Sequence, residues 1–325
     1  MTRKLPRRED LTICFAHPAY RMQERFTLRN TGIKSFEVRS RDELAARIGE
    51  ADVLCVSGFW RNELIGLAPR LAFIQSISAG TDQYSRELLA QAGIRVASAQ
   101  GSNERAVAEH AIALILALAR KLPMARDNQA AHSWRGLISE IPKREDELGG
   151  KTLVIVGMGR IGSRLATLAR AFDMHVIGVK RDPSSGAEAA HRVVAQTEMA
   201  SVLRQADFVA LTCSLNPSTE NLFDARALAA MKPSAYLVNV ARGKVVHEPS
   251  VVEALRAGTL AGAALDTAWE EPLPPESPLW TAPNAFITPH TAGETQKYED
   301  NVLDLLSENL ARLWRGEARL LNEFV

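Results

Sequence analysis

Short apolar runs alternate with amphipathic stretches along most of the chain, a pattern typical of α/β proteins. In the first hundred residues, four apolar runs predict strands at 11–16, 51–57, 71–78 and 94–99. Segments 41–49 and 84–93 have helical periodicity and end near a glycine, so they are the predicted connecting helices. Because strands joined through helices pair in parallel, we expect a parallel sheet here.

The stretch 152–182 organises the second half of the pattern. Its apolar run 153–156 precedes a G-x-G-x-x-G turn, a helical pattern and a second apolar run at 176–179. In such a βαβ unit, the glycines allow a tight turn, close approach of a pyrophosphate and close packing of the helix on the strand. We therefore predict a dinucleotide site, with glycine-assisted packing as the alternative. The expected contacts are Gly157, Met158, Gly159, Arg160, Ile161 and Gly162.

The α/β rhythm continues to the C-terminus. Further strands are predicted at 207–213, 235–241, 260–266 and 285–290, with helices at 225–232 and 249–258 and an amphipathic helix from about 299 to a stop at Gly316. A helix over 104–121 is apolar on nearly all faces, which predicts burial at a domain junction or subunit interface.

Residues 122–150 between this helix and the glycine unit are polar, and we expect an irregular excursion. Trp134 is predicted to be a packing anchor there, with a substrate or interface contact as the alternative.

Composition limits the class of protein. A length of 325 residues suggests two domains, and 46% hydrophobic with 24% charged residues is typical of soluble globular proteins. The formal net charge of +1 gives no support for a nucleic-acid or membrane partner. The basic start lacks the apolar core of a secretory signal, and the three cysteines are far apart. We expect a cytoplasmic protein with reduced thiols and no metal site.

Three ionisable residues are predicted to follow strands downstream of the glycine unit. Arg242, Glu271 and His290 combine a guanidinium, a carboxylate and an imidazole. Hydride transfer to a 2-oxo acid needs such a set, because arginine binds the carboxylate or carbonyl oxygen, histidine donates the proton and the carboxylate orients its ring. Taken singly, each has an ordinary alternative: a surface ion pair, a loop charge and the end of a strand.

Several ordered motifs carry a resemblance to a known family. They are ISAGTDQY at 77–84, ERAVAEHAIALILALARKLP at 104–123, VGMGRIG at 156–162, NVARGKVV at 239–246, AGAALDTAWEEPLPPESPLW at 261–280 and PNAFITPHTAG at 283–293. Together they resemble the D-isomer-specific 2-hydroxyacid dehydrogenases, and within them the glyoxylate and hydroxypyruvate reductases. The first fifty residues match only in their α/β rhythm.

The resemblance implies the architecture. It predicts two Rossmann-like parallel-sheet domains with an active-site cleft between them. The substrate domain would be discontinuous, 1–103 plus 293–325, and the dinucleotide-binding domain would cover 104–292 and include a dimerisation helix. Members of the family are usually homodimers joined through the nucleotide domain, which agrees with the apolar helix at 104–121.

The resemblance also implies residue roles. His290 would be the general acid in reduction, Glu271 its carboxylate partner, and Arg242 the residue that binds and polarises the substrate. Asp266 would hold the nicotinamide amide, and Gly293 would contact the cofactor.

The substrate carboxylate would lie against Gly58, Ala79 and Gly80, together with Arg242. A turn at 78–82 in which Asp82 caps the next helix is the local alternative for Ala79 and Gly80.

One departure from the family pattern bears on the cofactor. Members that prefer NAD place an Asp on the ribose at the end of the second strand, where this chain has Lys180 followed by Arg181. Two cations attract a 2′-phosphate, so NADP is the predicted cofactor and NAD remains possible. The alternatives are that both side chains face solvent, or that Asp182 contacts the ribose. Ser214 is a second departure, at a position often held by proline in the cofactor pocket.

The favoured reaction is reduction of glyoxylate or hydroxypyruvate to the D-2-hydroxy acid. Phe59 and Trp60 predict a closed pocket for a small or apolar substrate, with membership of the core as the alternative. An NAD-linked phosphoglycerate-type or bulkier-substrate dehydrogenase remains open, as does a non-catalytic, nucleotide-sensing scaffold.

Overall fold

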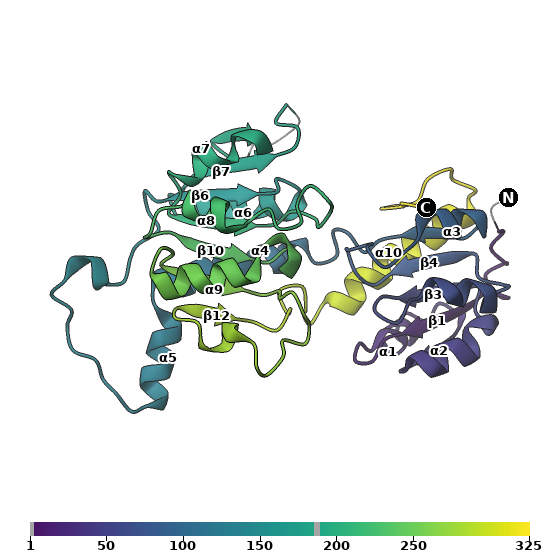
Figure 1. The fold of residues 1–325 in the computed structure, drawn as a ribbon. Helices are drawn as coiled ribbons and strands as arrows, with labels where there is room; N and C mark the ends of the chain where they lie inside the picture. Colours follow the sequence, from purple (N-terminus) through teal and green to yellow (C-terminus); the bar gives the residue numbers. More distant parts are fainter. Residues whose placement is uncertain (1–2, 185–188) are drawn as a thin grey trace. The chain divides into compact units, whose positions relative to one another are not determined.

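A computed structural model describes residues 3–184 and 189–325 and divides the chain into two compact units (Figure 1). Unit 1 combines the chain up to Asn103 with Glu294–Val325, and unit 2 is Glu104–Gly293. Each unit is built on one parallel sheet, as the alternating pattern predicts.

Unit 1 contains a five-stranded sheet in the order β2-β1-β3-β4-β5. Side chains alternate along β1, so that Phe15 packs with α1 and α10 on one face while Cys14 packs with α2 and α3 on the other. The strands are β1 (Thr12–Ala16), β2 (Lys34–Val38), β3 (Val53–Val56), β4 (Phe73–Ser76) and β5 (Arg95–Ala97). The helices are α1 (Met22–Thr27), α2 (Arg41–Arg47), α3 (Arg86–Gln91) and α10 (Tyr298–Trp314), with 3-10 turns at Ile48–Glu50 and Asn62–Leu67.

Unit 2 contains a seven-stranded sheet in the order β12-β11-β10-β9-β6-β7-β8, which is the doubly wound dinucleotide-binding order extended by one strand. Helices α4 and α6 cover one face and α7, α8 and α9 the other. The strands are β6 (Thr152–Val156), β7 (His175–Lys180), β8 (Arg192–Ala195), β9 (Phe208–Leu211), β10 (Tyr236–Asn239), β11 (Gly262–Leu265) and β12 (Ala285–Ile287). The helices are α4 (Glu104–Ala119), α5 (Leu122–Ala130), α6 (Arg160–Ala171), α7 (Met199–Leu203), α8 (Ala225–Ala229) and α9 (Glu248–Ala257).

The apolar helix α4 is buried inside unit 2. It packs against α6 and against strands β10 and β11, which accounts for apolar residues on most of its faces. The prediction extended this helix to Lys121, which is wrong by two residues. Lys121 has a left-handed backbone (φ +51°), so the helix ends at Ala119.

Several short elements were not predicted from the sequence. Strands β2 and β8 are the edges of their sheets, and their side chains are only partly buried, so their apolar pattern is weak. Helices α1 and α7 are six and five residues long, too short for a clear periodicity.

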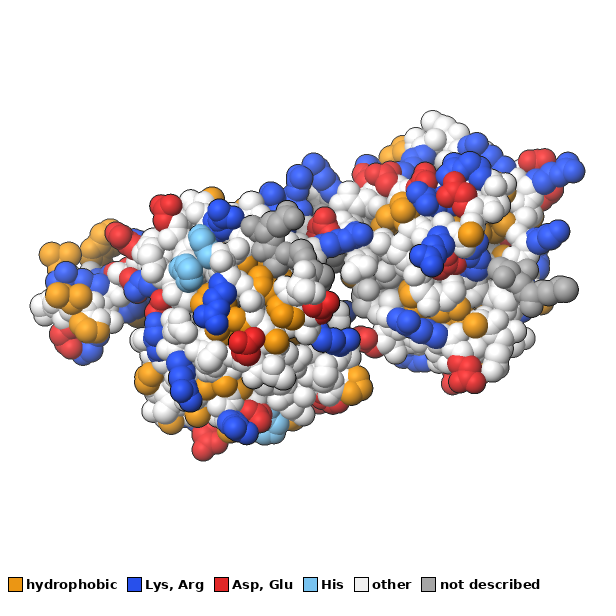
Figure 2. Space-filling view, turned by 90° about the horizontal axis from the view of Figure 1, so that it is seen from above, with side chains coloured by type: hydrophobic (Ala, Val, Ile, Leu, Met, Phe, Trp, Pro, Cys, Tyr) orange, Lys and Arg blue, Asp and Glu red, His pale blue; other side chains and the backbone are white. Residues whose placement is uncertain are grey.

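Residues 122–145, here called the arm, correct two further expectations. The segment begins with the helix α5 and is therefore not irregular throughout. Figure 1 shows the arm leaving the rest of unit 2, and Figure 2 shows apolar side chains gathered on it. Trp134 is 99% exposed, so it does not anchor packing within this chain. Leu122, Leu137 and Ile141 are exposed as well.

Candidate active site

The glycine turn follows β6, at the point where the strand order of unit 2 changes direction. Gly157 has φ +106°, and a Cβ there would lie 2.6 Å from the amide nitrogen of Cys213, the second residue after β9. A Cβ on Gly162 would lie 2.1 Å from the carbonyl oxygen of Gly157. Only glycine fits either position, so these two glycines allow the tight turn and the close packing of α6 on it. A Cβ on Gly159 would meet no atom within 4 Å, so the space beside this residue is open.

This turn fits a dinucleotide. Helix α6 is twelve residues long and begins at Arg160, directly after Gly159, so its first amides lack intrahelical acceptors and its positive end faces the turn. Ile161 lies in the first turn, and the side chain of Met158 is buried against Gly178 of β7. A bound nicotinamide dinucleotide would place its pyrophosphate at these amides.

Lys180, Arg181 and Asp182 follow at the end of β7, which pairs with β6. The side chains of Arg181 and Asp182 are exposed, and Lys180 is partly buried. Ser184 donates to Asp182 Oδ1 from its backbone nitrogen at 3.0 Å and from its hydroxyl at 2.6 Å. These hydrogen bonds lower the pKa of Asp182 and hold its carboxylate on the local turn.

His290 and Glu271 are brought together although they leave different strands. His290 Nδ1 lies 2.6 Å from Glu271 Oε2, and the amide of Ala268 donates to Glu271 Oε1 at 3.0 Å. Burial alone would raise the pKa of Glu271, but the hydrogen bond from His290, the charge of His290, the Ala268 amide and the charge of Arg242 together lower it. The carboxylate is therefore ionised and acts as an acceptor for the ring.

Arg242 follows β10 in an extended conformation, one residue before Gly243. A Cβ on Gly243 would lie 1.9 Å from the carbonyl oxygen of Ala268, so only glycine lets the loops after β10 and β11 approach this closely. Buried Asn239, at the end of β10, supports the turn: its Oδ1 accepts from the amide of Ala241 and its Nδ2 donates to the carbonyl oxygen of Arg242, both at 3.0 Å. This role of Asn239 was not predicted; an amide at the end of an apolar strand was the available signal.

Asp266 follows β11 and its side chain is 1% exposed. The amide of Thr291 donates to its Oδ1 at 3.0 Å and the amide of Ala292 to its Oδ2 at 3.1 Å. The Thr288 hydroxyl also donates to Oδ1, at 2.6 Å, and His110 of α4 lies beside it. Burial would raise the pKa of Asp266, but the neighbouring His110, the Thr288 hydroxyl and the Ala292 amide lower it, so the buried carboxylate is ionised. His110 and Thr288 were not predicted; a lone histidine on an apolar helix was the signal.

Three of the four predicted substrate residues, all except Arg242, lie in unit 1. Gly58 follows β3, and Ala79 and Gly80 follow β4. Because these neighbouring strands are parallel, all three residues lie at the carboxyl ends of the strands. The hydroxyls of Ser57 and Ser78 are hydrogen bonded at 3.2 Å and join the two loops.

The structure decides between alternatives at two positions in unit 1. Trp60 is fully buried and stacks on Tyr84, so it belongs to the core and does not line a pocket. The cap of α3 is Ser85, which accepts from the amide of Leu88, and not Asp82.

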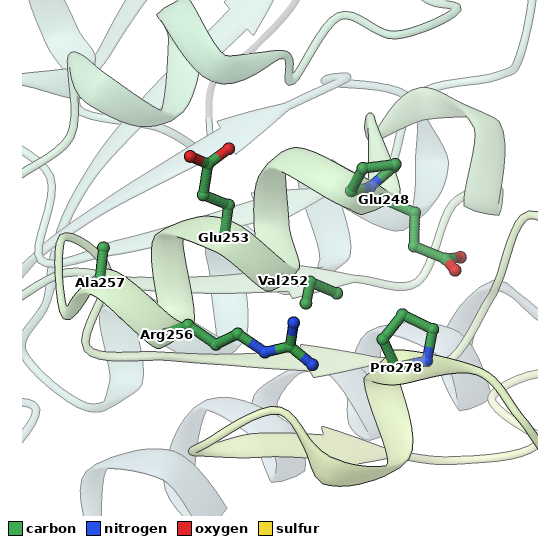
Figure 3. Close-up of a pocket in the computed structure, with 7 residues that line it drawn as sticks. Glu248, Val252, Glu253, Arg256, Ala257 and Pro278 are labelled. Atoms are coloured by element: carbon green, nitrogen blue, oxygen red, sulfur yellow. The ribbon is translucent and has the colours of Figure 1, made fainter.

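A cavity of about 530 Å³ lies beside His290 and Glu271, lined by residues of 265–268, 271–273, 279–280 and 287–290. A second hollow of similar volume runs along α9 (Figure 3) and contains none of the predicted site residues in its lining. Its three charged members, Glu248, Glu253 and Arg256, all lie on α9, whose other face is buried in the core of unit 2. The predicted catalytic residues Arg242, Glu271 and His290 therefore lie in the loops that follow β10, β11 and β12.

Gly293 ends unit 2, one residue after the buried Ala292.

Within residues 3–184 and 189–325, no group of three or more His, Cys, Asp or Glu side chains is placed to hold a metal ion. In the same residues, no helix is both long and apolar enough to cross a membrane.

Comparisons with known proteins identify the family and the fold. Residues 112–292 match the family model described as D-isomer specific 2-hydroxyacid dehydrogenase, NAD binding domain. The chain is 35% identical over 286 residues to a glyoxylate reductase of Pyrococcus furiosus, covering 85% of this chain and 83% of that protein.

A D-3-phosphoglycerate dehydrogenase of Methanocaldococcus jannaschii is 33% identical over 86% of this chain, but the match covers only 52% of that longer protein. The chain thus spans about half the length of such relatives. The crystal structure of TT0316 protein from Thermus thermophilus has a TM-score of 0.84 at 32% identity and covers 97% of this chain and 100% of its own.

Proposed function

Because the chain belongs to the D-isomer-specific 2-hydroxyacid dehydrogenase family of oxidoreductases, we propose that it reduces a small 2-oxo acid to the D-2-hydroxy acid. Glyoxylate and hydroxypyruvate are the favoured substrates, supported by the relative named glyoxylate reductase. The observation that carries the proposal is the 2.6 Å contact between His290 Nδ1 and Glu271 Oε2, with Arg242 close enough to influence the carboxylate.

The contact assigns the two ring nitrogens of His290 to different tasks. Nδ1 is held by Glu271, so Nε2 is the atom that donates a proton to the oxygen of the substrate. A bound nicotinamide cofactor supplies the hydride. The ionised Glu271 stabilises the protonated ring before transfer, and Arg242 binds the substrate carboxylate or carbonyl oxygen with its planar guanidinium. The backbone amides of Ala79 and Gly80, with the loop at Gly58, are proposed to bind the oxygens of the substrate carboxylate.

NADPH is the proposed cofactor in preference to NADH. Lys180 and Arg181 supply two positive charges at the end of β7, while Asp182 Oδ1 is already occupied by Ser184. Asp266 and Gly293 are proposed to contact the nicotinamide end.

A Lys180→Glu, Arg181→Glu variant tests this choice, with kcat/KM for the two cofactors as the measurement. We expect the NADPH/NADH ratio to fall by about tenfold or more, because each lost or reversed cation removes roughly 1 kcal/mol of attraction for the 2′-phosphate. An unchanged ratio would contradict the assignment. A variant with the matched charge change at Arg170 and Arg204, two exposed arginines at the carboxyl ends of α6 and α7, is the control for net charge.

A homodimer joined through unit 2 is the proposed assembly. The support comes from the arm, where Leu122, Trp134, Leu137 and Ile141 present large exposed apolar side chains. A Trp134→Ser, Leu137→Ser variant is expected to shift the mass measured by light scattering toward the monomer. Leu67→Ser, an exposed apolar position in unit 1, is the control and is expected to leave the mass unchanged.

The activity is tested by NADPH and NADH oxidation with glyoxylate, hydroxypyruvate, pyruvate, phenylpyruvate and 3-phosphohydroxypyruvate. We expect the highest kcat/KM with NADPH and the two smallest acids, and loss of turnover in His290→Ala with little change in cofactor affinity. Preference for the phosphorylated acid would instead indicate a phosphoglycerate-type enzyme. Nucleotide binding without turnover of any acid would favour a nucleotide-sensing scaffold.

A further inference from the structure

His110 lies on α4 and contacts the loop after β12. Its Nε2 is 3.0 Å from the hydroxyl oxygen of Thr288, and that hydroxyl oxygen is 2.6 Å from Asp266 Oδ1. The same nitrogen lies 3.4 Å from Asp266 Oδ1. An imidazole, a hydroxyl and a carboxylate from three separate elements thus form one connected network.

The direction of the hydrogen bonds follows from the number of protons. A hydroxyl has one proton to donate, and an ionised carboxylate can only accept. At 2.6 Å from Oδ1, the Thr288 hydroxyl must donate to Asp266, because two acceptors at this distance would repel each other. The hydroxyl oxygen therefore accepts from His110, which places a proton on Nε2.

The network uses one oxygen of Asp266 more than the other. Oδ1 accepts hydrogen bonds from the Thr288 hydroxyl and the Thr291 amide. Among the described residues, Oδ2 accepts one hydrogen bond, from the Ala292 amide. A carboxylate oxygen can accept about two hydrogen bonds, so Oδ2 retains capacity for a donor on a ligand. The donors on Oδ1 prevent the carboxylate from rotating away from that orientation.

We propose that His110 is a positioning residue, which acts through the Thr288 hydroxyl to hold Asp266 with Oδ2 directed at the carboxamide of the nicotinamide. This inference rests on the proposed function, because it takes Asp266 as the group that meets the nicotinamide end. His110 supplies an N–H donor to the Thr288 hydroxyl oxygen, and the negative charge stays on Asp266. It touches neither the substrate nor the reacting atoms, and its effect is on cofactor affinity more than on the chemical step.

Three variants separate positioning from packing. His110→Gln keeps an N–H near the place of Nε2, His110→Leu removes the donor while keeping an apolar side chain on an apolar helix, and Thr288→Val removes the hydroxyl with little change of shape. His191→Gln is the matched control. His191 accepts from the backbone nitrogen of Val176 at the opposite, amino end of the strands.

The dissociation constant for NADPH, measured by fluorescence titration without substrate, is the first measurement, and the thermal midpoint is recorded for each variant. We expect His110→Leu and Thr288→Val each to raise this constant about fivefold to tenfold, the effect of one hydrogen bond to a charged network. kcat with glyoxylate is expected to change by less than about threefold. His110→Gln is expected to stay within about twofold of the parent, and the double variant to be no worse than His110→Leu, since both changes break one network.

The measured NADPH affinities decide whether His110 positions Asp266. Unchanged NADPH affinity in His110→Leu and Thr288→Val, or failure of His110→Gln to restore it, would overturn the positioning role whatever the thermal midpoint shows. An equal loss in His191→Gln would also overturn it. Failure of the proposed function has a different signature: a parent protein that binds NADPH without reducing any 2-oxo acid refutes the reaction, while the affinity ratios still decide the role of His110.

Discussion

Replacing Glu271 with Gln gives the most direct test of the proposed proton donor. The side chain keeps its shape and its Oε1 can still accept from the Ala268 amide, but the partner of His290 Nδ1 becomes a neutral amide. If its NH₂ group faces Nδ1, it donates to that nitrogen and opposes protonation of the ring. The change therefore removes the charge that stabilises the protonated form of His290 and leaves the fold of the loop intact.

The distance between His290 Nδ1 and Glu271 Oε2 gives the size of the electrostatic energy that the variant loses. At 2.6 Å, Coulomb's law predicts about 1.6 kcal/mol in a water-like dielectric and about 6 kcal/mol at an effective dielectric of about 20. His290 and Glu271 are 45% and 38% exposed, so solvent screens the pair and the lower part of this range applies. A loss of about 2 kcal/mol corresponds to a roughly thirtyfold reduction in kcat for reduction of the 2-oxo acid.

Initial rates with saturating NADPH, measured from about pH 6 to about pH 8, check the prediction. The defect is expected across this whole range, because the variant lacks the charge that stabilises the ring while it donates its proton. In the parent, the lowered pKa of Glu271 keeps the carboxylate ionised as the pH falls below the usual range for glutamate, so its support is lost only in strong acid. NADPH affinity and the thermal midpoint serve as controls. A variant within about threefold of the parent across this range would refute the reasoning.

Three further outcomes are expected. Gly243→Ala should lower the free energy of unfolding by about 2–4 kcal/mol in urea denaturation, because its Cβ would meet the backbone at Ala268, and an unchanged midpoint would contradict the close approach. Burial raises the pKa of the Cys213 thiol to about 11, so iodoacetamide at about pH 8 should modify it slowly until the protein is unfolded, as mass spectrometry can show. The hydrogen bond from Arg25 lowers the pKa of Asp300, so Asp300→Asn should lower the urea midpoint near neutral pH. That difference should vanish as the pH falls through the lowered pKa, and its persistence in acid would contradict the ion pair.

Local pattern was sufficient for the class of fold. The run 153–156, the glycines and the second run at 176–179 predict β6, α6 and β7, because a buried parallel strand, a tight turn and an amphipathic helix each leave a signal within a few residues. The order of the motifs was also sufficient for the family. Edge strands β2 and β8 escaped prediction because they are half exposed, and their pairing depends on strands elsewhere in the chain.

The features that local pattern did not predict depend on contacts between positions far apart in the sequence. The hydrogen bond between His110 and Thr288 joins residues 178 positions apart, and no local pattern contains it. Nor did local pattern distinguish Trp60, which is buried in the core, from Trp134, which is exposed on the arm. The residue types available for chemistry are written in the sequence. Which of them share a hydrogen bond, a buried charge or a solvent-facing surface depends on the packing of strand ends, because a parallel sheet brings together loops that the chain itself keeps far apart.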